Sequence, residues 1–197
     1  DHIGMIISWL KENGLYDDDL AIIITADHGE DIGEFGVYAE HGMADEPVCR
    51  IPLIVRWPGM RRGEVVKGFY DNTDLAPTVQ ELLGTGMFAP DRYRYDGVSF
   101  AAALRDGTDC TGQDCSKDHL VLTQCAHVCQ RSARFDDYVY IRTVHGGYHL
   151  LPEEMLFNVV EDPHEQHNLA KEHPELCAKG AKMILDWNDA MMKTSRY

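Results

Sequence analysis

Three stretches near the start of the chain have the hydrophobic pattern of regular secondary structure. Residues 2–13 carry apolar side chains at the spacing of one helical face, which predicts an amphipathic helix. Residues 20–25 and 51–57 are nearly continuous apolar runs bounded by polar or Pro-Gly positions, a pattern typical of strands buried in a parallel sheet. Between the two strands, residues 26–49 form an irregular segment rich in glycine and acidic residues.

Further along, the pattern changes from long elements to short ones. Residues 74–83 start with an acidic side chain, carry proline in the first turn and stop at glycine, as a capped helix does. A short helix is expected near 99–105. Short strands and a last helix then follow at 119–124, 131–135, 138–144, 148–151, 155–159 and 174–192. Such closely spaced strands predict an antiparallel meander.

The first strand runs directly into an Asp-His-Gly corner formed by Asp27, His28 and Gly29. In open α/β sheets, ligands bind at the carboxyl ends of the strands, where the loops leave the packed layers. A carboxylate oxygen beside a neutral imidazole nitrogen is suited to a divalent cation. The alternative is a helix N-cap aspartate with a hydrogen-bonded histidine, since Asp and Gly are common in turns.

Several separated segments together resemble the sulfatase family, within the alkaline phosphatase superfamily of metal-dependent sulfate and phosphate ester hydrolases. Their order and spacing extend the resemblance over nearly all 197 residues. The segments are TADHGE (25–30), EHG (40–42), RIPLIVRWPG (50–59), DLAPTVQELLG (74–84), DGVSF (96–100) and LFNVVEDPHEQHNLA (156–170).

The resemblance implies an α/β fold, as part of an alkaline phosphatase-like sandwich with a mostly parallel sheet. A small C-terminal antiparallel sheet and a terminal helix complete it. We therefore expect residues 1–110 to be the C-terminal part of the sulfatase α/β catalytic domain. Residues 111–197 are expected to be the small antiparallel subdomain with its C-terminal helix.

Sulfatases also carry a Cys or Ser followed by Pro or Ala two positions on and Arg four positions on, and this Cys or Ser is converted to the formylglycine nucleophile. No Cys or Ser of this chain fits that pattern; in the nearest case, Ser99, Ala103 stands where Arg is needed. The resemblance thus implies a C-terminal portion, with the formylglycine in a missing N-terminal half. Alone, such a portion is expected to be inactive.

The resemblance also assigns roles to residues of the site. Asp27 and His28 are expected as metal ligands, with Ca²⁺ as the first expectation and Mn²⁺ or Zn²⁺ as alternatives because imidazole favours softer ions. His41 is expected to contact the sulfate and to assist the leaving group, unless it is an exposed loop histidine. His145 is expected to bind substrate, with His127 and His149 as further candidates.

The acidic residues of the loop, Glu30, Asp31, Glu34 and Glu40, are expected to be solvated. A net charge of −15 argues against nonspecific nucleic-acid binding, which needs a basic surface. No apolar run reaches the roughly 18 residues that span a membrane. Of the six cysteines, Cys110 and Cys115 would form a local disulfide in an exported protein, whereas reduced thiols are expected in a cytoplasmic one.

The resemblance thus implies a sulfuric ester hydrolase that acts on a small-molecule or carbohydrate sulfate ester with the help of a divalent metal. One alternative is a phosphonate monoester or phosphodiester hydrolase of the same superfamily. Another is an inert fragment with no activity of its own. The compartment, cytoplasmic or exported, and the oligomeric state stay open.

Overall fold

The computed structural model describes residues 1–85, 95–106 and 117–194. The chain divides into two compact units, one made of Asp1–Ala26 with Pro52–Ser116 and the other of Asp27–Ile51 with Lys117–Tyr197. The acidic segment 27–51 therefore belongs to the same unit as the C-terminal strands. The boundary expected after residue 110 and the expected Cys110–Cys115 disulfide lie outside the described residues and stay predictions.

In the first unit, β1 (Ile22–Thr25) pairs with β4 (Leu53–Arg56), and Ile23 lies opposite Val55. Both strands were predicted, but this pair is antiparallel, so the parallel arrangement expected at this place does not hold for the two described strands. The physical reason is that an apolar run reports burial and carries no information on strand direction.

The helices of the first unit follow the sequence prediction closely. They are α1 (His2–Glu12), α3 (Leu75–Leu83) and α4 (Ala101–Asp106), with a 3-10 turn η2 (Asn72–Asp74) before α3. Asp71 and Asp74 form a reciprocal capping box at this turn, and Gly84 ends α3 in the left-handed conformation with φ of 62°. The acidic start and the glycine stop of this helix are thus confirmed.

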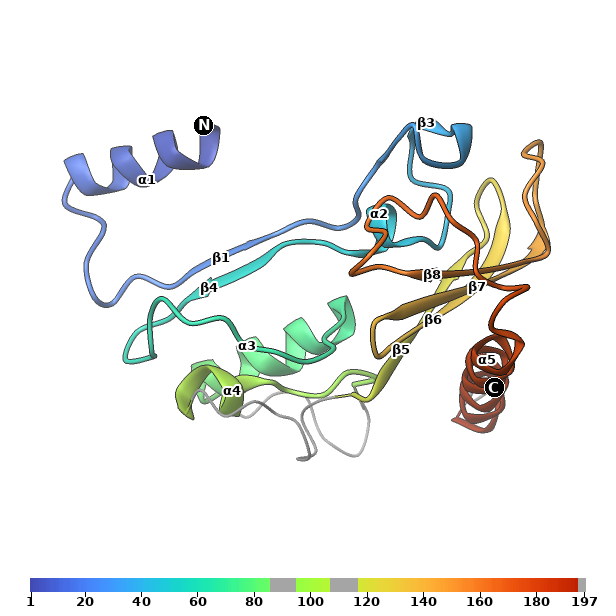
Figure 1. The fold of residues 1–197 in the computed structure, drawn as a ribbon. Coiled ribbons are helices and arrows are strands. Elements are labelled where there is room, and N and C mark those ends of the chain that lie inside the picture. Colours follow the sequence, from blue (N-terminus) through green and yellow to red (C-terminus); the bar gives the residue numbers. More distant parts are fainter. Residues whose placement is uncertain (86–94, 107–116, 195–197) are drawn as a thin grey trace. The chain divides into compact units, whose positions relative to one another are not determined.

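The second unit is built on a four-stranded antiparallel sheet in the order β5-β6-β7-β8 (Figure 1). Its strands are β5 (His119–Gln124), β6 (Cys129–Phe135), β7 (Tyr138–His145) and β8 (Glu154–Asn158). The predicted meander is confirmed, but the strand expected at 148–151 is wrong. A turn closed by the His149 N–H and the Gly146 carbonyl stands there, and Gly147 adopts φ of 61°.

Alternate residues of each strand point to opposite faces of this sheet. On one face, Phe135, Tyr140 and Leu156 pack against Cys177 and Ile184 of α5 (Pro174–Thr194). Figure 1 shows this helix, in red, beside the sheet. The C-terminal helix predicted from the sequence therefore covers one side of the meander.

The other face of the sheet is covered by the acidic segment. Val37 and Met43 of that segment pack against Ile141 and Phe157. The buried Gln130 side chain accepts a hydrogen bond from the Ala44 N–H at 3.0 Å. The segment expected to be an irregular loop contains short elements: β2 (Asp31–Ile32), η1 (Glu34–Gly36), β3 (Tyr38–Glu40) and α2 (Glu46–Cys49). This packing fixes the segment that carries the candidate site.

None of the helices in the described parts of the chain is long and apolar enough to cross a lipid bilayer.

Candidate functional site

The Asp-His-Gly corner is held against helix α2 at its glycine. The Gly29 N–H donates a hydrogen bond to the Val48 carbonyl at 2.7 Å. A Cβ atom at this position would lie 1.9 Å from the Pro47 carbonyl oxygen, which is far inside van der Waals contact. Only glycine allows this approach, so Gly29 fixes where the side chains of Asp27 and His28 begin.

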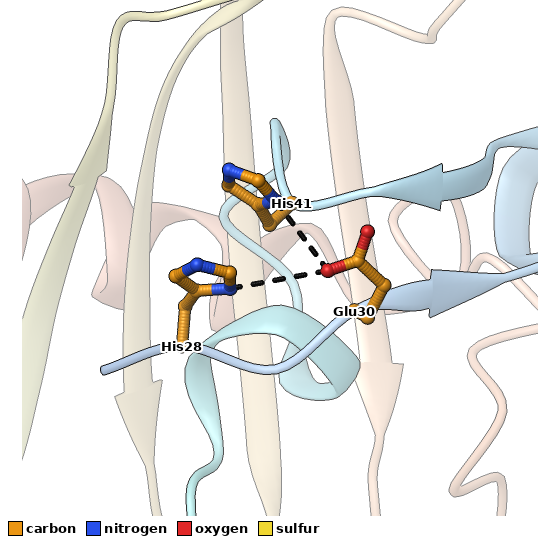
Figure 2. Close-up of side chains that lie close together, drawn as sticks. All are labelled: His28, Glu30 and His41. Atoms are coloured by element: carbon orange, nitrogen blue, oxygen red, sulfur yellow. Dashed lines mark ion pairs between the residues drawn. The ribbon is translucent and has the colours of Figure 1, made fainter. Parts of the chain in front are cut away.

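Three side chains, one of them from this corner, converge as Figure 2 shows. Single ligand atoms of His28, Glu30 and His41 all lie within 4.8 Å of one another. The Glu30 Oε2 atom lies 3.4 Å from Nδ1 of His41 and 4.0 Å from Nδ1 of His28. The two imidazole rings stack with centroids 3.9 Å apart and an interplanar angle of 23°.

The neighbours of His28 determine which of its ring nitrogens is available to a metal. Nδ1 lies 2.7 Å from the Gly29 carbonyl oxygen. A carbonyl only accepts hydrogen bonds, so Nδ1 carries the proton and Nε2 keeps its lone pair. The Asp27 Oδ2 atom lies 3.7 Å from this Nε2. The free nitrogen of His28 therefore faces the carboxylate of Asp27, whereas Glu30 lies on the Nδ1 side and the His41 ring stacks on the His28 ring.

The Asp27 carboxylate is exposed and is oriented by the backbone. Its Oδ1 atom accepts a hydrogen bond from the His28 N–H at 3.0 Å. Backbone N–H groups, first its own and then that of His28, lower the pKa of the Asp27 carboxyl below its ordinary value, and the neighbouring imidazoles lower it further. Asp27 is thus an anion near neutral pH, the form in which a carboxylate binds a cation.

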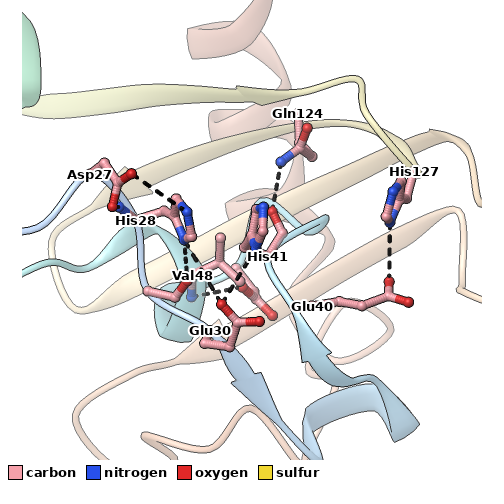
Figure 3. A network of polar contacts seen from close by, with 10 residues as sticks. Asp27, His28, Glu30, Glu40, His41, Val48, Gln124 and His127 are labelled. Carbon is pink, nitrogen blue, oxygen red and sulfur yellow. Dashed lines mark hydrogen bonds and ion pairs between the residues drawn. The ribbon is translucent and has the colours of Figure 1, made fainter.

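His41 is held from both of its ends (Figure 3). Its ring faces Glu30, and its backbone carbonyl accepts a hydrogen bond from Nε2 of Gln124 at 2.9 Å. A carboxylate beside Nδ1 fixes the orientation and tautomer of an imidazole. Neither Glu30 nor Gln124 was singled out from the sequence for this purpose. An acidic residue two positions after the histidine was the only available signal for Glu30.

The other candidate histidines have partners away from the cluster. Nδ1 of His127 lies 3.3 Å from Glu40 Oε2, and Nε2 of His149 lies 3.5 Å from the same oxygen. The His145 Nδ1 atom accepts a hydrogen bond from the Gly147 N–H at 3.1 Å. Within the described residues, the converging group contains none of these three histidines, and the substrate-binding role of His145 stays a prediction.

The acidic residues of this segment were expected to be solvated, and for Asp31 this expectation is wrong. Asp31 and Asp45 are completely buried, and Glu165 from the loop after β8 is 3% exposed. Burial, together with neighbouring carboxylates, raises the pKa of Asp31 to about 9 and that of Glu165 to about 8. Burial also raises the pKa of Asp45. Hydrophobic pattern alone did not reveal this burial, because Glu165, which packs beside these residues, comes from a distant part of the sequence.

A separate cavity of about 700 Å³ lies in the second unit, beside this buried acidic group. Its lining includes Glu34, Phe35, Phe157, His164 and Glu165. Oε1 of Glu34 lies 3.6 Å from Nδ1 of His164. The cavity lining contains neither His28 nor His41, so this hollow is distinct from the candidate metal centre.

Comparison with known proteins shows which family the segment that carries the site is similar to. Residues 1–85, which include the Asp-His-Gly corner and the whole acidic segment, match the family model described as Sulfatase. This stretch is similar to the sulfatase family. The sulfatase resemblance of the chain is therefore confirmed. The match covers Asp27, His28, Glu30 and His41, but it assigns no role to any of them.

Relatives of this sulfatase-like chain extend the similarity beyond residue 85. The N-acetylglucosamine-6-sulfatase of Capra hircus is 26% identical over 206 aligned positions, which cover 91% of this chain and 36% of the relative. The N-acetylglucosamine-6-sulfatase of Bos taurus is 25% identical with the same coverage. The chain thus spans just over a third of the length of these curated relatives.

Solved structures show the fold. A protein solved in complex with its substrate D-glucosamine-2-N,6-O-disulfate matches 98% of this chain and 38% of its own, with a TM-score of 0.75 and 21% identity. The phosphonate monoester hydrolase of Agrobacterium radiobacter matches 95% of this chain and 38% of its own, with a TM-score of 0.71 and 23% identity. The alkaline phosphatase-like α/β fold with its small antiparallel sheet is confirmed.

Proposed function

We propose that this chain supplies the metal-binding corner and a proton donor to a hydrolase that cleaves a sulfate ester. The observation that carries this proposal is the convergence of His28, Glu30 and His41 beside Asp27, within the segment that matches the sulfatase family. The chain spans only 36% of the length of its Capra hircus relative. The hydrolase activity is therefore proposed for the whole protein and not for this chain alone.

In this proposal Asp27 and His28 bind a divalent metal ion, through a carboxylate oxygen and Nε2. The ion, when bound, neutralises charge that develops on the nonbridging sulfate oxygens and orients the nucleophile. The Gly29 carbonyl keeps the His28 ring in the tautomer that leaves Nε2 free. The Asp27 carboxyl is ionised without the metal, so binding at this oxygen releases no proton near neutral pH.

His41 is the proposed proton donor to the leaving oxygen of the ester. In the donating form the His41 ring is an imidazolium, whose Nδ1–H faces the Glu30 carboxylate at 3.4 Å and whose Nε2–H gives its proton to the leaving oxygen. Glu30 acts through His41 in this scheme and is a positioning residue. Gln124 contributes by holding the backbone of His41 in place.

The donor atoms also bear on the identity of the metal. Ca²⁺ takes oxygen ligands almost exclusively, whereas imidazole nitrogen suits Mn²⁺ and Zn²⁺. Because His28 offers a free Nε2 next to the Asp27 oxygen, we now place Mn²⁺ or Zn²⁺ ahead of Ca²⁺. The measurement that tests this order is competition among the three ions for the purified chain.

For the substrate we propose a carbohydrate sulfate ester. The support is that the named relatives include two N-acetylglucosamine-6-sulfatases and that a protein of the same fold was solved with a sulfated glucosamine. A phosphonate monoester is the second candidate, supported by the phosphonate monoester hydrolase of the same fold.

The experiment that separates the candidates is intact-mass measurement and peptide mapping of the native protein purified from its source. A Cys or Ser converted to formylglycine, together with hydrolysis of N-acetylglucosamine 6-sulfate, supports the sulfatase. An unmodified Ser or Thr nucleophile with turnover of a phenylphosphonate monoester would move the protein to the second candidate. In both outcomes Asp27→Ala should abolish turnover.

A further inference from the structure

Two cysteines lie face to face at the turn between β5 and β6. Cys125 follows β5 directly and Cys129 is the first residue of β6, and their Sγ atoms are 3.5 Å apart. Gln124 and Gln130 are paired in the ladder, so Cys125 and Cys129 are the next opposed positions. Opposed residues of an antiparallel pair have Cα atoms about 4.5–5.5 Å apart, which is within the range that a disulfide spans.

The pair is accessible and is activated by a neighbouring cation. Cys125 is exposed and Cys129 is half-buried. Nη1 of Arg131 donates a hydrogen bond to the Cys125 sulfur at 3.2 Å. This hydrogen bond lowers the pKa of the Cys125 thiol, whereas the contact with Cys125 raises the pKa of the Cys129 thiol. Cys125 is therefore the thiol that ionises first and attacks an electrophile.

A short chain of hydrogen bonds connects this pair to the candidate active site. The Gln124 Oε1 atom accepts hydrogen bonds from the N–H groups of Cys125 and Ala126, at 2.8 and 2.9 Å. The same side chain donates through Nε2 to the His41 carbonyl at 2.9 Å. Figure 3 shows Gln124 reaching from the strand to His41. A displacement of the Cys125 backbone therefore moves Gln124, whose side chain donates the hydrogen bond to His41.

We propose that Cys125 and Cys129 form a reversible thiol–disulfide modification site, and that closure of this disulfide changes the environment of His41 through Gln124. The Sγ atoms must approach from 3.5 Å to about 2.05 Å for the bond to form. The turn 125–129 tightens as they do so. Exposed disulfides of this kind are the readily reduced, regulatory ones.

The oxidant in this proposal is a low-molecular-weight disulfide such as oxidised glutathione. The Cys125 thiolate attacks one sulfur of the small disulfide, forms a mixed disulfide and releases one small thiolate. Cys129 then loses its proton, and its sulfur attacks the Cys125 sulfur and releases the second small thiolate. The two protein thiols are oxidised, the small disulfide is reduced to two thiols, and the protons go to solvent or to the released thiolates.

Other described cysteines lack these features and provide the internal comparison. The thiol of Cys49 is half-buried and Cys177 is buried, and burial raises the pKa of both thiols. Neither lies within bonding reach of a second described cysteine in the contacts of the structure. A small disulfide should therefore modify Cys125 before it modifies either of them.

The first test is to treat the full chain with oxidised glutathione and to map disulfide-linked peptides by mass spectrometry. We expect a Cys125–Cys129 linkage that dithiothreitol removes. The linkage should also form in a chain with Cys110→Ser and Cys115→Ser, and in the control variant Cys49→Ser. Persistent glutathione on Cys125 without closure, or no reaction at Cys125, would overturn the proposal.

The second test asks whether the modification reaches His41, and it is independent of ester hydrolysis. The ring signals of His41, assigned with His41→Gln, are recorded by NMR in the reduced and oxidised chain. We expect these signals to shift on oxidation in the wild type and to stay in place in Cys125→Ser, which has no thiol to start the reaction. In Gln124→Ala the disulfide should still form while the shift at His41 shrinks. A linkage that forms in the wild type without any shift at His41 would contradict the proposed connection.

Discussion

Glu30 lies within ion-pair distance of both imidazoles, at 3.4 Å from His41 and 4.0 Å from His28. Of these two histidines only His28 is a proposed metal ligand, and a carboxylate beside the imidazole of a metal ligand typically contributes about 10–100-fold to metal affinity. We therefore expect Glu30→Gln to weaken Mn²⁺ binding to the chain by about 10-fold or more, because the amide keeps the shape but removes the charge. Isothermal titration with Mn²⁺ measures this change.

The control for that variant is Glu40→Gln, which makes the same charge change in the same segment. Glu40 faces His127 and His149 instead of the cluster. The Glu40→Gln variant should keep the Mn²⁺ affinity within about 3-fold of the wild type, since long-range charge effects are screened at ordinary salt. Equal losses in the two variants would mean that net charge, and not the position of Glu30, controls binding.

Glu165 makes the stability of the second unit depend on pH. Its pKa is raised from the ordinary value of 4.5 to about 8, chiefly by burial. Between these two values the folded chain keeps a proton that the unfolded chain has released, so the free energy of unfolding falls as the pH rises through this window. Glu165→Gln removes this loss and should be ~1–3 kcal/mol more stable than the wild type near pH 8.5.

Urea unfolding of wild type and Glu165→Gln, followed from about pH 5 to pH 9, checks the sign of this linkage. The two chains should be nearly equal in stability at the acidic end, where Glu165 is protonated, and diverge toward the alkaline end. The exposed Glu161→Gln serves as the matched control and should follow the wild type. A constant difference between Glu165→Gln and the wild type at every pH would contradict a titration effect.

At the scale of elements, Gly180 lets α5 approach the sheet closely. A Cβ atom there would lie 2.6 Å from Cβ of the fully buried Tyr140. We expect Gly180→Ala to destabilise the fold by ~1–3 kcal/mol through overpacking. Gly4→Ala in α1, where nothing lies within 4 Å, should instead stabilise by ~0.5–1 kcal/mol. Urea unfolding followed by circular dichroism measures both changes in the free energy of unfolding. If the two variants changed it in the same direction, the packing explanation would be excluded.

Periodicity was sufficient to find most elements, because one face of each is buried in a continuous layer. Helix α5 and strands β5, β7 and β8 were predicted within a few residues for this reason. The incorrect secondary-structure predictions fall in segments where no buried layer imposes a regular hydrophobic pattern. Tyr148 and Leu150 are exposed beside the turn that Gly146 and His149 close. The β2–β3 hairpin depends on packing against a sheet that begins after residue 117.

At the scale of the whole molecule, the sequence predicted only part of the site, because the rest depends on contacts between distant segments. Asp27 and His28 stand at the end of an apolar strand, a position that carries a local signal. The stacking of His28 on His41 has no local sequence signal. It requires that Val37 and Met43 pack on the sheet and that Gln124 hold His41 in place. These contacts join residues about a hundred positions apart, which a periodic pattern does not encode.

The last prediction concerns activity of the chain alone. Asp27 and His28 offer two ligands, and no Cys or Ser of the 197 residues has the pattern from which formylglycine arises. A net charge of −15 also repels an anionic ester. We therefore expect the purified 197-residue chain with Mn²⁺ to hydrolyse p-nitrophenyl sulfate at the rate of buffer, and Asp27→Ala to leave that rate unchanged while weakening Mn²⁺ binding. Turnover above the buffer rate that disappears in Asp27→Ala would show instead that these residues suffice for catalysis, with a nucleophile inside this chain.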